Sequence, residues 1–438
     1  MLNRDSLAKI DYTLFFIVFL LACISYISIS MAPLKSGAPA VGLAYRQVIW
    51  YVFSTMIAVA IMFFDYERLK RMHWIFYGIG MFLLIGLTFA QLGLPIPMVD
   101  KSHGATSWYA MPGIGQLQPS EFMKLFMIVS IATTIDKHNE VYSIRGLRED
   151  LLLLGKIALV SFPPFILVFI QPDLGTALVM FSIILSMTIV SGINWKIIVS
   201  ILTTLTAGLA FFAISWFHFP TVINFFLKSH QKGRFLAWQD PERYSMDEGY
   251  QLLQSMKSIG SGEFFNHQFN SAIVFPESYN DFIFAVIGGS FGFVGAVTVI
   301  LLFFLLISRV IKAGAETHDP FGGYICTGIV GMIMFQVFEN IGMTIQVMPV
   351  TGITLPFLSY GGSSLLSSMI CIGLVQSIRL QTQNLCSPKQ PRAAVFNKEI
   401  KYMALNLLKG TSDFSDTEIK LMKQAQLEKI GEKARYGG

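Results

Sequence analysis

The sequence has few charged residues: Asp, Glu, Lys and Arg make up 13% of its 438 residues. Soluble domains carry about 25%, so this deficit indicates that lipid is the solvent. Leu, Ile, Phe and Met fill long stretches without strand or helix alternation, as expected of helices that are apolar all round. The first run, Tyr12 to Met31, is too long for a signal-peptide core and lacks a small-residue cleavage site, so we interpret it as a retained span.

Several common motifs are also missing. The four cysteines form no CxxC pair, which argues against a disulfide framework or a zinc site. There is no Walker A loop, HExxH or GxSxG sequence, so nucleotide hydrolysis, zinc proteolysis and elbow-type acyl transfer lack support. We find no internal repeat, which weakens an inverted-repeat transporter. The net charge of +5 is better explained by membrane topology than by nucleic acid binding.

The apolar runs are each long enough to cross a bilayer, which takes about 20 residues. They predict an all-α integral membrane protein with a membrane domain over 1–378, a large outer loop over about 219–280 between helices 7 and 8, and a polar cytoplasmic tail over 379–438. The ten predicted spans are 12–31, 46–64, 73–93, 120–136, 155–171, 175–193, 197–218, 282–308, 321–344 and 362–378.

Most of the 32 Lys and Arg residues fall in the tail and in alternate loops. By the positive-inside rule this predicts that both termini are cytoplasmic. The motif-like segments then face outward together: the polar loop 219–280, the loop around Trp108, the turn Gln171–Gly175 and the loop Met348–Ser364. We therefore expect one external site built from several loops over a helical scaffold.

Asp281 directly follows the polar loop and stands at the mouth of the predicted helix 282–308. A charge at a membrane boundary is costly unless it is paired or used. Two interpretations stay open: a general base or cation ligand on the outer face, or an N-cap whose carboxylate accepts helix N–H groups. Spacing alone favours the cap.

Two further candidates lie around the fourth predicted helix. Trp108 is either an interfacial anchor or a stacking surface for a sugar ring, and spacing favours the anchor. Glu121 and Lys124 are three residues apart and share a helix face. They form either a simple ion pair or a site in which Lys124 binds an anionic head group, with Pro119 in the first turn.

Other candidates are polar residues in outer segments. Asp173 is expected to cap the sixth helix, with a second role open. Arg234 either lies in a solvated loop or grips a pyrophosphate as a bidentate fork. Glu339 and Asn340 fall inside the ninth span, where polar groups pair with each other or with backbone and mark sites. The turn after Pro356 permits close backbone approach to a ligand or forms an ordinary tight turn; its candidate residues are Ser359, Gly361, Gly362 and Ser363.

Taken together, these segments resemble the SEDS family, and within it the RodA-type peptidoglycan polymerases. The resemblance covers roughly residues 10–380. It implies ten helices with a large outer loop, polymerisation of lipid II, a catalytic residue at Asp281, an important tryptophan at Trp108, and a class B penicillin-binding protein as partner. The motifs that carry it are, in order, GATSW (104–108), LQPSEFMKL (117–125), QPDLGTA (171–177), GYQLLQS (249–255), PESYNDFIFAVIG (276–288) and NIGM…PVTGITLPFLSYGGSS (340–364).

The chain departs from the family pattern near these motifs. Related sequences often carry a glutamate pair where this chain has Gly289 and Ser290, and a threonine where it has Asn280. They have a small residue at the position of Lys257 and a glycine-rich stretch at Glu263 to Asn266. They also have a glycine at the position of Gln346. These changes crowd the site region and could mark a specialised paralogue.

The implied chemistry suits these residues. Lipid II carries its own pyrophosphate leaving group, so one carboxylate suffices as base, whereas glycosidases need two. Arg234, Lys124 and a divalent cation (Mg or Mn) are the candidates to neutralise the pyrophosphate. Rival functions are a lipid II flippase or transporter and a non-catalytic scaffold for a transpeptidase. The RodA-like sequences of the LQPSEFMKL and GATSW motifs favour a role in cell elongation rather than in division or sporulation.

Overall fold

The computed structural model describes residues 10–32, 40–100, 106–111, 115–142, 145–218, 229–246, 249–266, 273 and 275–385. The chain divides into two compact units, Met1–Gln383 and Asn384–Gly438. The second contains most of the predicted polar tail, and beyond Leu385 it lies outside the described residues.

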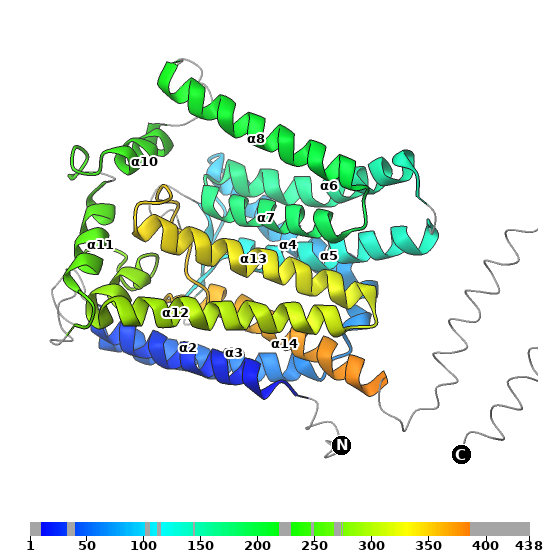
Figure 1. Ribbon diagram of the computed structural model, residues 1–438, viewed down its shortest axis with the longest axis horizontal. Coiled ribbons are helices and arrows are strands. Elements are labelled where there is room, and N and C mark those ends of the chain that lie inside the picture. Colours follow the sequence, from blue (N-terminus) through cyan, green and yellow to red (C-terminus); the bar gives the residue numbers. More distant parts are fainter. Residues whose placement is uncertain are drawn as a thin grey trace, which may run out of the picture. The chain divides into compact units, whose positions relative to one another are not determined.

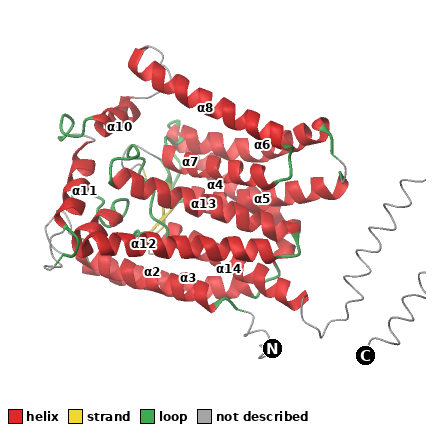
Figure 2. Cartoon of the chain, in the orientation of Figure 1, coloured by secondary structure: helices red, strands yellow, loops and turns green. Residues whose placement is uncertain are grey.

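Long helices dominate the first unit and run side by side (Figures 1 and 2). Within the described residues, ten helices of 17 residues or more fall at the ten places where the apolar runs predicted spans. They are α2 (Tyr12–Met31), α3 (Val41–Met62), α4 (Leu69–Gln91, after the short 3₁₀ helix η1, Tyr66–Arg68), α5 (Pro119–Val141), α6 (Leu147–Ile170), α7 (Leu174–Val190), α8 (Trp195–His218), α12 (Ile283–Glu316), α13 (Pro320–Thr344) and α14 (Gly362–Leu385).

The protein is a multi-pass membrane protein. Eight of these helices are long and apolar enough to cross a bilayer, and α7 is apolar but shorter. Helix α5 is not among them because it carries buried polar residues into the bundle, including Glu121, Lys124 and Asp136. None of the apolar window of α8 is buried, whereas 78% of that of α14 is. The bundle therefore has α14 inside and α8 at its margin, and the number of spans stays a prediction.

The predicted outer loop contains two short helices, α10 (Ser229–Gln239) and α11 (Gly249–Ser261), which lie at one end of the bundle (Figure 1). The segment around Trp108 forms a small antiparallel sheet that the sequence did not predict. Its strands are β1 (Val99–Asp100), β2 (Trp108–Met111) and β3 (Gly115–Leu117), in the order β1-β2-β3. Strands of two to four residues are too short for an alternating pattern to be recognised.

Helix α12 is broken at Gly292, whose φ of 67° and ψ of −162° are not helical. In a regular helix the N–H of Phe293 would bond to the carbonyl of Gly289. Instead it donates to the carbonyl of Glu263 (2.9 Å), and the Asn266 amide donates to the Gly289 carbonyl (2.6 Å). The segment after α11 is thus inserted into the hydrogen-bond ladder of α12, and the part of α12 before the break is fixed to the outer loop.

Two departures from the family pattern have structural reasons. A Cβ added at Gly289 would lie 2.5 Å from the Ser258 hydroxyl and 3.0 Å from its carbonyl, so a glutamate does not fit while α11 packs there. Gln346 adopts a φ of 63°, a conformation that favours glycine. Its amide donates to the Trp238 carbonyl, and the Trp238 indole donates to the Gln346 carbonyl, both at 2.9 Å.

Replacing Gly289 with alanine should destabilise the protein. The added methyl group overpacks the contact between α11 and α12, a change that costs about 1–3 kcal/mol. Gly260→Ala on α11 is the matched control, because a Cβ there meets nothing within 4 Å and alanine is the better helix former. Thermal unfolding of the purified variants in detergent measures both. Equal Tm values for Gly289→Ala and the wild type would contradict this packing.

Candidate functional site

Asp281 lies one residue before the N-cap of α12 and does not cap the helix. The N-cap is Phe282, which makes no side-chain capping bond, so the N-cap interpretation is wrong. The main-chain carbonyl of Asp281 accepts a hydrogen bond from the Asn340 amide on α13 (2.7 Å), which also donates to the carbonyl of Ile353 (2.7 Å). Asn340 therefore pairs with backbone, as predicted, and ties Asp281 to the segment around residue 353.

The Val350–Ile353 turn is packed against the Asp281 carboxylate. Gly352 has a φ of 77°, and a Cβ added there would lie 3.3 Å from Asp281 Oδ2, so glycine allows the backbone to come close. Arg234 on α10 donates through Nη1 to the carbonyls of Thr351 (3.3 Å) and Val350 (3.5 Å). The Thr351 hydroxyl donates to the carboxylate of Glu339 on α13. The turn thus brings α10, α13 and Asp281 together.

The environment of Asp281 favours its protonated form. Burial raises the pKa of this half-buried carboxyl well above its usual range, and the negative charges of Glu277, Glu339 and Asp173 act in the same direction. The Arg234 guanidinium lowers the pKa and partly offsets them. A carboxyl with a raised pKa is suited to accept a proton near neutral pH.

Asp173 caps α7, as predicted. Its carboxylate accepts from the Thr176 N–H (3.0 Å) and hydroxyl (2.9 Å), and also from the Gln118 amide (3.2 Å). Burial raises the pKa of Asp173, and the bonds from Thr176 oppose this rise. Because Gln118 directly precedes α5, Asp173 also joins the starts of α5 and α7, and its role in substrate binding stays a prediction.

Glu121 and Lys124 form a buried ion pair on one face of α5, as their spacing predicted. Lys124 Nζ lies 2.8 Å from Glu121 Oε1, and the Ser367 hydroxyl on α14 donates to Glu121 Oε2 (3.0 Å). The Lys124 side chain is 1% exposed. In this conformation its ammonium group faces Glu121 and is closed off from solvent.

The first part of the Ser359–Ser364 turn holds the backbone just before Asp281. The Ser359 hydroxyl donates to the Asn280 carbonyl (2.7 Å), and the N–H of Tyr360 donates to the Tyr279 carbonyl (3.0 Å). The Ser359 carbonyl in turn accepts from the Gln47 amide on α3 (3.1 Å). Ser359 is therefore a structural support of the site.

The rest of this predicted turn is Gly361 and the first residues of α14, and it is joined to α3 and to the small sheet. A Cβ at Gly362 would come within 2.6 Å of the Trp50 ring, so this glycine is needed for packing, while the N–H of Gly361 donates to Gln47 (3.4 Å). The Ser363 hydroxyl donates to the carbonyl of Gln116 in β3 (3.2 Å) and accepts from the N–H of Gln118 (3.2 Å).

Trp108 is half-buried at the start of β2, opposite Asp100 in β1. It is joined to the other candidates through the sheet, since β2 pairs with β3 and β3 bonds to Ser363. Within the described residues no hydrogen bond joins its side chain to Asp281 or Arg234, and its role as a stacking surface stays a prediction.

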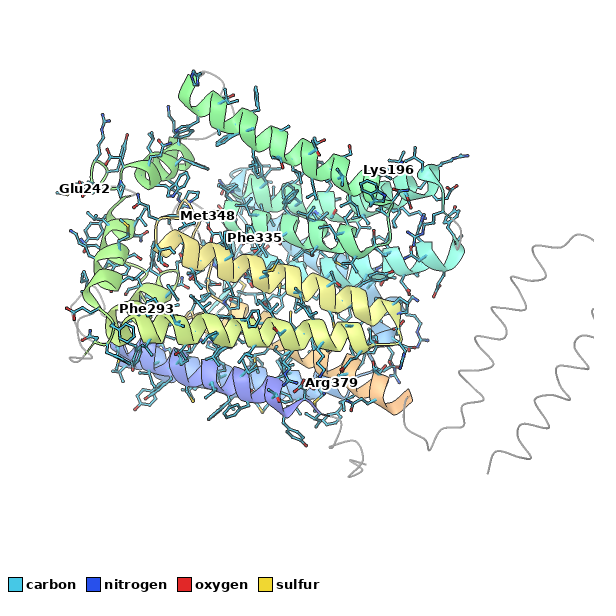
Figure 3. The ribbon with its side chains drawn as sticks, viewed as in Figure 1. Lys196, Glu242, Phe293, Phe335, Met348 and Arg379 are labelled. Atoms are coloured by element: carbon cyan, nitrogen blue, oxygen red, sulfur yellow. The ribbon has the colours of Figure 1, made fainter. Side chains whose placement is uncertain are left out.

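A pocket opens beside Arg234, between the start of α7, helix α10 and the segment that follows α13. Figure 3 labels Met348 in this segment, at the end of the bundle where α10 and α11 lie. The lining is apolar apart from one guanidinium and one threonine, and consists of Pro172, Leu174, Arg234, Phe235, Pro349, Val350 and Thr351. The pocket is small, and its lining places one cation among apolar side chains.

Three residues of this network were not singled out from the sequence: Gln118, Thr351 and Gln47. Gln118 stands immediately before the first-turn proline of α5, a position where a side chain can reach a neighbouring helix end. Gln47 is an uncharged residue inside an apolar run and gives no sequence signal. The part of the chain that the structure describes holds no group of three or more His, Cys, Asp or Glu residues suited to a metal ion.

Removing one member of the buried ion pair should cost more than removing both. Lys124→Met leaves the Glu121 carboxylate buried and unpaired, which costs about 3–5 kcal/mol. The double variant Glu121→Gln/Lys124→Met should recover most of this loss, because a neutral pair needs no counter-charge. Unfolding in detergent measures the difference. A Lys124→Met protein as stable as the wild type would contradict this account of the buried pair.

Comparisons with known proteins agree with this architecture. The family model for FtsW, RodA and SpoVE, described as cell cycle protein, matches residues 9–384. Stage V sporulation protein E of Bacillus subtilis is 31% identical over 340 residues, which cover 76% of this chain and 86% of that protein. The peptidoglycan glycosyltransferase MrdB of Escherichia coli is 34% identical over 282 residues, covering 63% of this chain and 71% of that protein.

Solved structures show the same fold. A chain from a peptidoglycan synthase complex that couples polymerization and crosslinking aligns with a TM-score of 0.68 and 27% identity, over 85% of this chain and 98% of that chain. The rod shape determining protein RodA of Thermus thermophilus aligns with a TM-score of 0.59 and 25% identity, over 84% of this chain and 96% of that chain. The resemblance inferred from the six motifs is confirmed, and the chain belongs to the SEDS family of FtsW, RodA and SpoVE proteins.

Proposed function

We propose that this protein is a peptidoglycan glycosyltransferase, which polymerises lipid II into glycan strands and releases polyprenyl pyrophosphate. The observation that carries the proposal is the Asp281 carboxylate, which is half-buried and stands beside Arg234. Arg234 also lines an apolar pocket. Relatives named peptidoglycan glycosyltransferase MrdB and probable peptidoglycan glycosyltransferase FtsW support the same reaction.

Asp281 acts as the general base. A sugar hydroxyl of one lipid-linked substrate attacks the anomeric carbon of the other, and its proton passes to the Asp281 carboxylate. The bond from that carbon to the pyrophosphate oxygen breaks, and the electron pair leaves with the pyrophosphate. Since this leaving group needs charge neutralisation and no proton, a single carboxylate meets the acid–base requirement.

Arg234 is the cation best placed for the pyrophosphate, because it lines the pocket. Lys124 acts from the interior, where it neutralises Glu121 and keeps the start of α5 in position next to Asp173. A divalent cation (Mg or Mn) would further neutralise the pyrophosphate charge. Such an ion would be held by the phosphate oxygens of the substrate.

The proposed partner is a class B penicillin-binding protein, which would crosslink the strands made here. The similarity to a chain from a peptidoglycan synthase complex that coordinates polymerization and crosslinking supports this pairing. The proposed process is cell elongation, because the LQPSEFMKL and GATSW motifs resemble those of RodA-type proteins. Purified protein with labelled lipid II in detergent distinguishes the reaction from its rivals: glycan polymer on a gel identifies an enzyme, whereas a flippase or a scaffold makes none.

Asp281→Asn and Asp281→Ala should both reach the membrane and make almost no polymer. Because Asp281 caps no helix, neither change should remove a capping bond. Loss of a general base should lower the rate by roughly 10²–10⁴-fold. Glu242→Gln is the matched control, since this carboxylate is exposed in the outer loop (Figure 3). Near wild-type polymerisation by Asp281→Asn would assign the base elsewhere, with Glu277 next to test.

The proposed orientation puts both termini in the cytoplasm and the site on the outer face of the bacterial cell membrane. In a variant without Cys23, Cys326, Cys371 and Cys386, a single cysteine at Ser245 should react with a membrane-impermeant maleimide in intact cells. A cysteine at Ala425 in the tail should react only after the cells are opened. Labelling of the cysteine at position 425 in intact cells would contradict the proposed topology.

A further inference from the structure

Glu339 is a buried carboxylate that the reaction described above does not use. It lies on α13 with 0% of its surface exposed. Its Oε1 accepts a hydrogen bond from the Thr351 hydroxyl, while its Oε2 has no hydrogen-bond partner within the described residues. A buried polar atom without a partner costs about 1–3 kcal/mol. Glu339 therefore reduces stability where it stands, which makes a role in the site the better explanation.

The contacts of Glu339 lead directly to the site. Thr351, which bonds to Glu339, offers its carbonyl to Arg234 at 3.3 Å. The next residue, Gly352, is the one that approaches the Asp281 carboxylate. Asn340, which follows Glu339 in the chain, bonds to the carbonyl of Ile353 and to that of Asp281. Two consecutive side chains of α13 thus hold the Val350–Ile353 turn and Asp281 in one arrangement.

We propose that Glu339 is a positioning residue of the polymerase site, which fixes the Val350–Ile353 turn between Asp281 and Arg234 and places a second negative charge beside them. The inference rests on the proposed function, because it assigns Glu339 a part in the same reaction. Glu339 acts through Thr351 and through its charge and touches neither substrate.

The charges around Asp281 come from several elements. Glu277 and Tyr279 belong to its own segment, Arg234 comes from α10, and Asp173 from the start of α7. Within this set, the negative charge of Glu339 raises the pKa of Asp281 and the positive charge of Arg234 lowers it. Removal of the Glu339 charge should therefore lower the pKa of Asp281, and removal of the Arg234 charge should raise it.

The test is the pH profile of lipid II polymerisation by the full-length protein in detergent. A base works when deprotonated, so activity rises with pH through the pKa of Asp281. Glu339→Gln keeps an oxygen acceptor for Thr351 but loses the charge, and it should move this acid limb to lower pH. Arg234→Gln should move it to higher pH. Gln336→Leu, a buried polar residue one turn earlier on α13, is the control and should leave the limb in place.

Thr351→Val provides a second measurement that does not depend on the Glu339 variant folding. It removes the hydroxyl that joins Glu339 to the turn but keeps the carboxylate, so kcat should fall by roughly 10- to 100-fold through misplacement of the site. A wild-type acid limb in Glu339→Gln, or a wild-type kcat in Thr351→Val, would overturn the inference while leaving the polymerase intact. If the wild-type protein makes no polymer, the proposed function itself has failed.

Discussion

The amide of Asn340 makes the contact on which the site depends, because it donates to the carbonyls of both Asp281 and Ile353. At the edge of a bilayer, irregular backbone is tolerated only where protein groups satisfy its N–H and C=O groups. The segments on either side of the site are irregular, and side chains from other helices supply the missing partners. Arg234 does so for Val350 and Thr351, and Ser359 does so for Asn280. The same bonds that make these loops possible also fix Asp281 in space.

Buried charge is the second constraint. The Glu121–Lys124 pair lies in the interior of the bundle and interacts electrostatically with Asp173. The charge of Glu121 raises the pKa of Asp173, and that of Lys124 lowers it. Asp173 in turn acts on Asp281, together with Glu277 and Glu339, and the positive charge of Arg234 opposes them. An excess of negative charge around a half-buried carboxylate keeps its proton affinity high. Burial and the nearby carboxylates, including Glu339 on α13 and Asp173 before α7, therefore raise the pKa of Asp281 together.

The sequence predicted features that depend on neighbours along one helix or on long apolar runs. The ten helices, the Asp173 cap and the Glu121–Lys124 face are of this kind. It did not predict the sheet around Trp108 or the links made by Gln118 and Gln47, because these depend on which loops meet in space. It misplaced Asp281 as a cap, since α12 begins one residue later than a capping Asp281 requires and Phe282 takes the capping position. The family motifs identified the important loops, but the contacts that these loops make could be seen only in the folded structure.

The break at Gly292 divides α12 into two parts with different attachments. The part before it, next to Asp281, is held by α11 and by Asn266, while the longer part packs among the membrane helices. Phe293 lies about 24 Å along the helix from Arg309, counting 1.5 Å per residue, which is shorter than the hydrocarbon core of about 30 Å. Exposed Phe264 stacks on exposed Phe293 there, with ring centroids 5.8 Å apart. On the proposed topology, with Arg309 at the inner boundary, this outer-loop segment lies at the depth of the lipid, and the position of Asp281 depends on the attachment of the segment to α12.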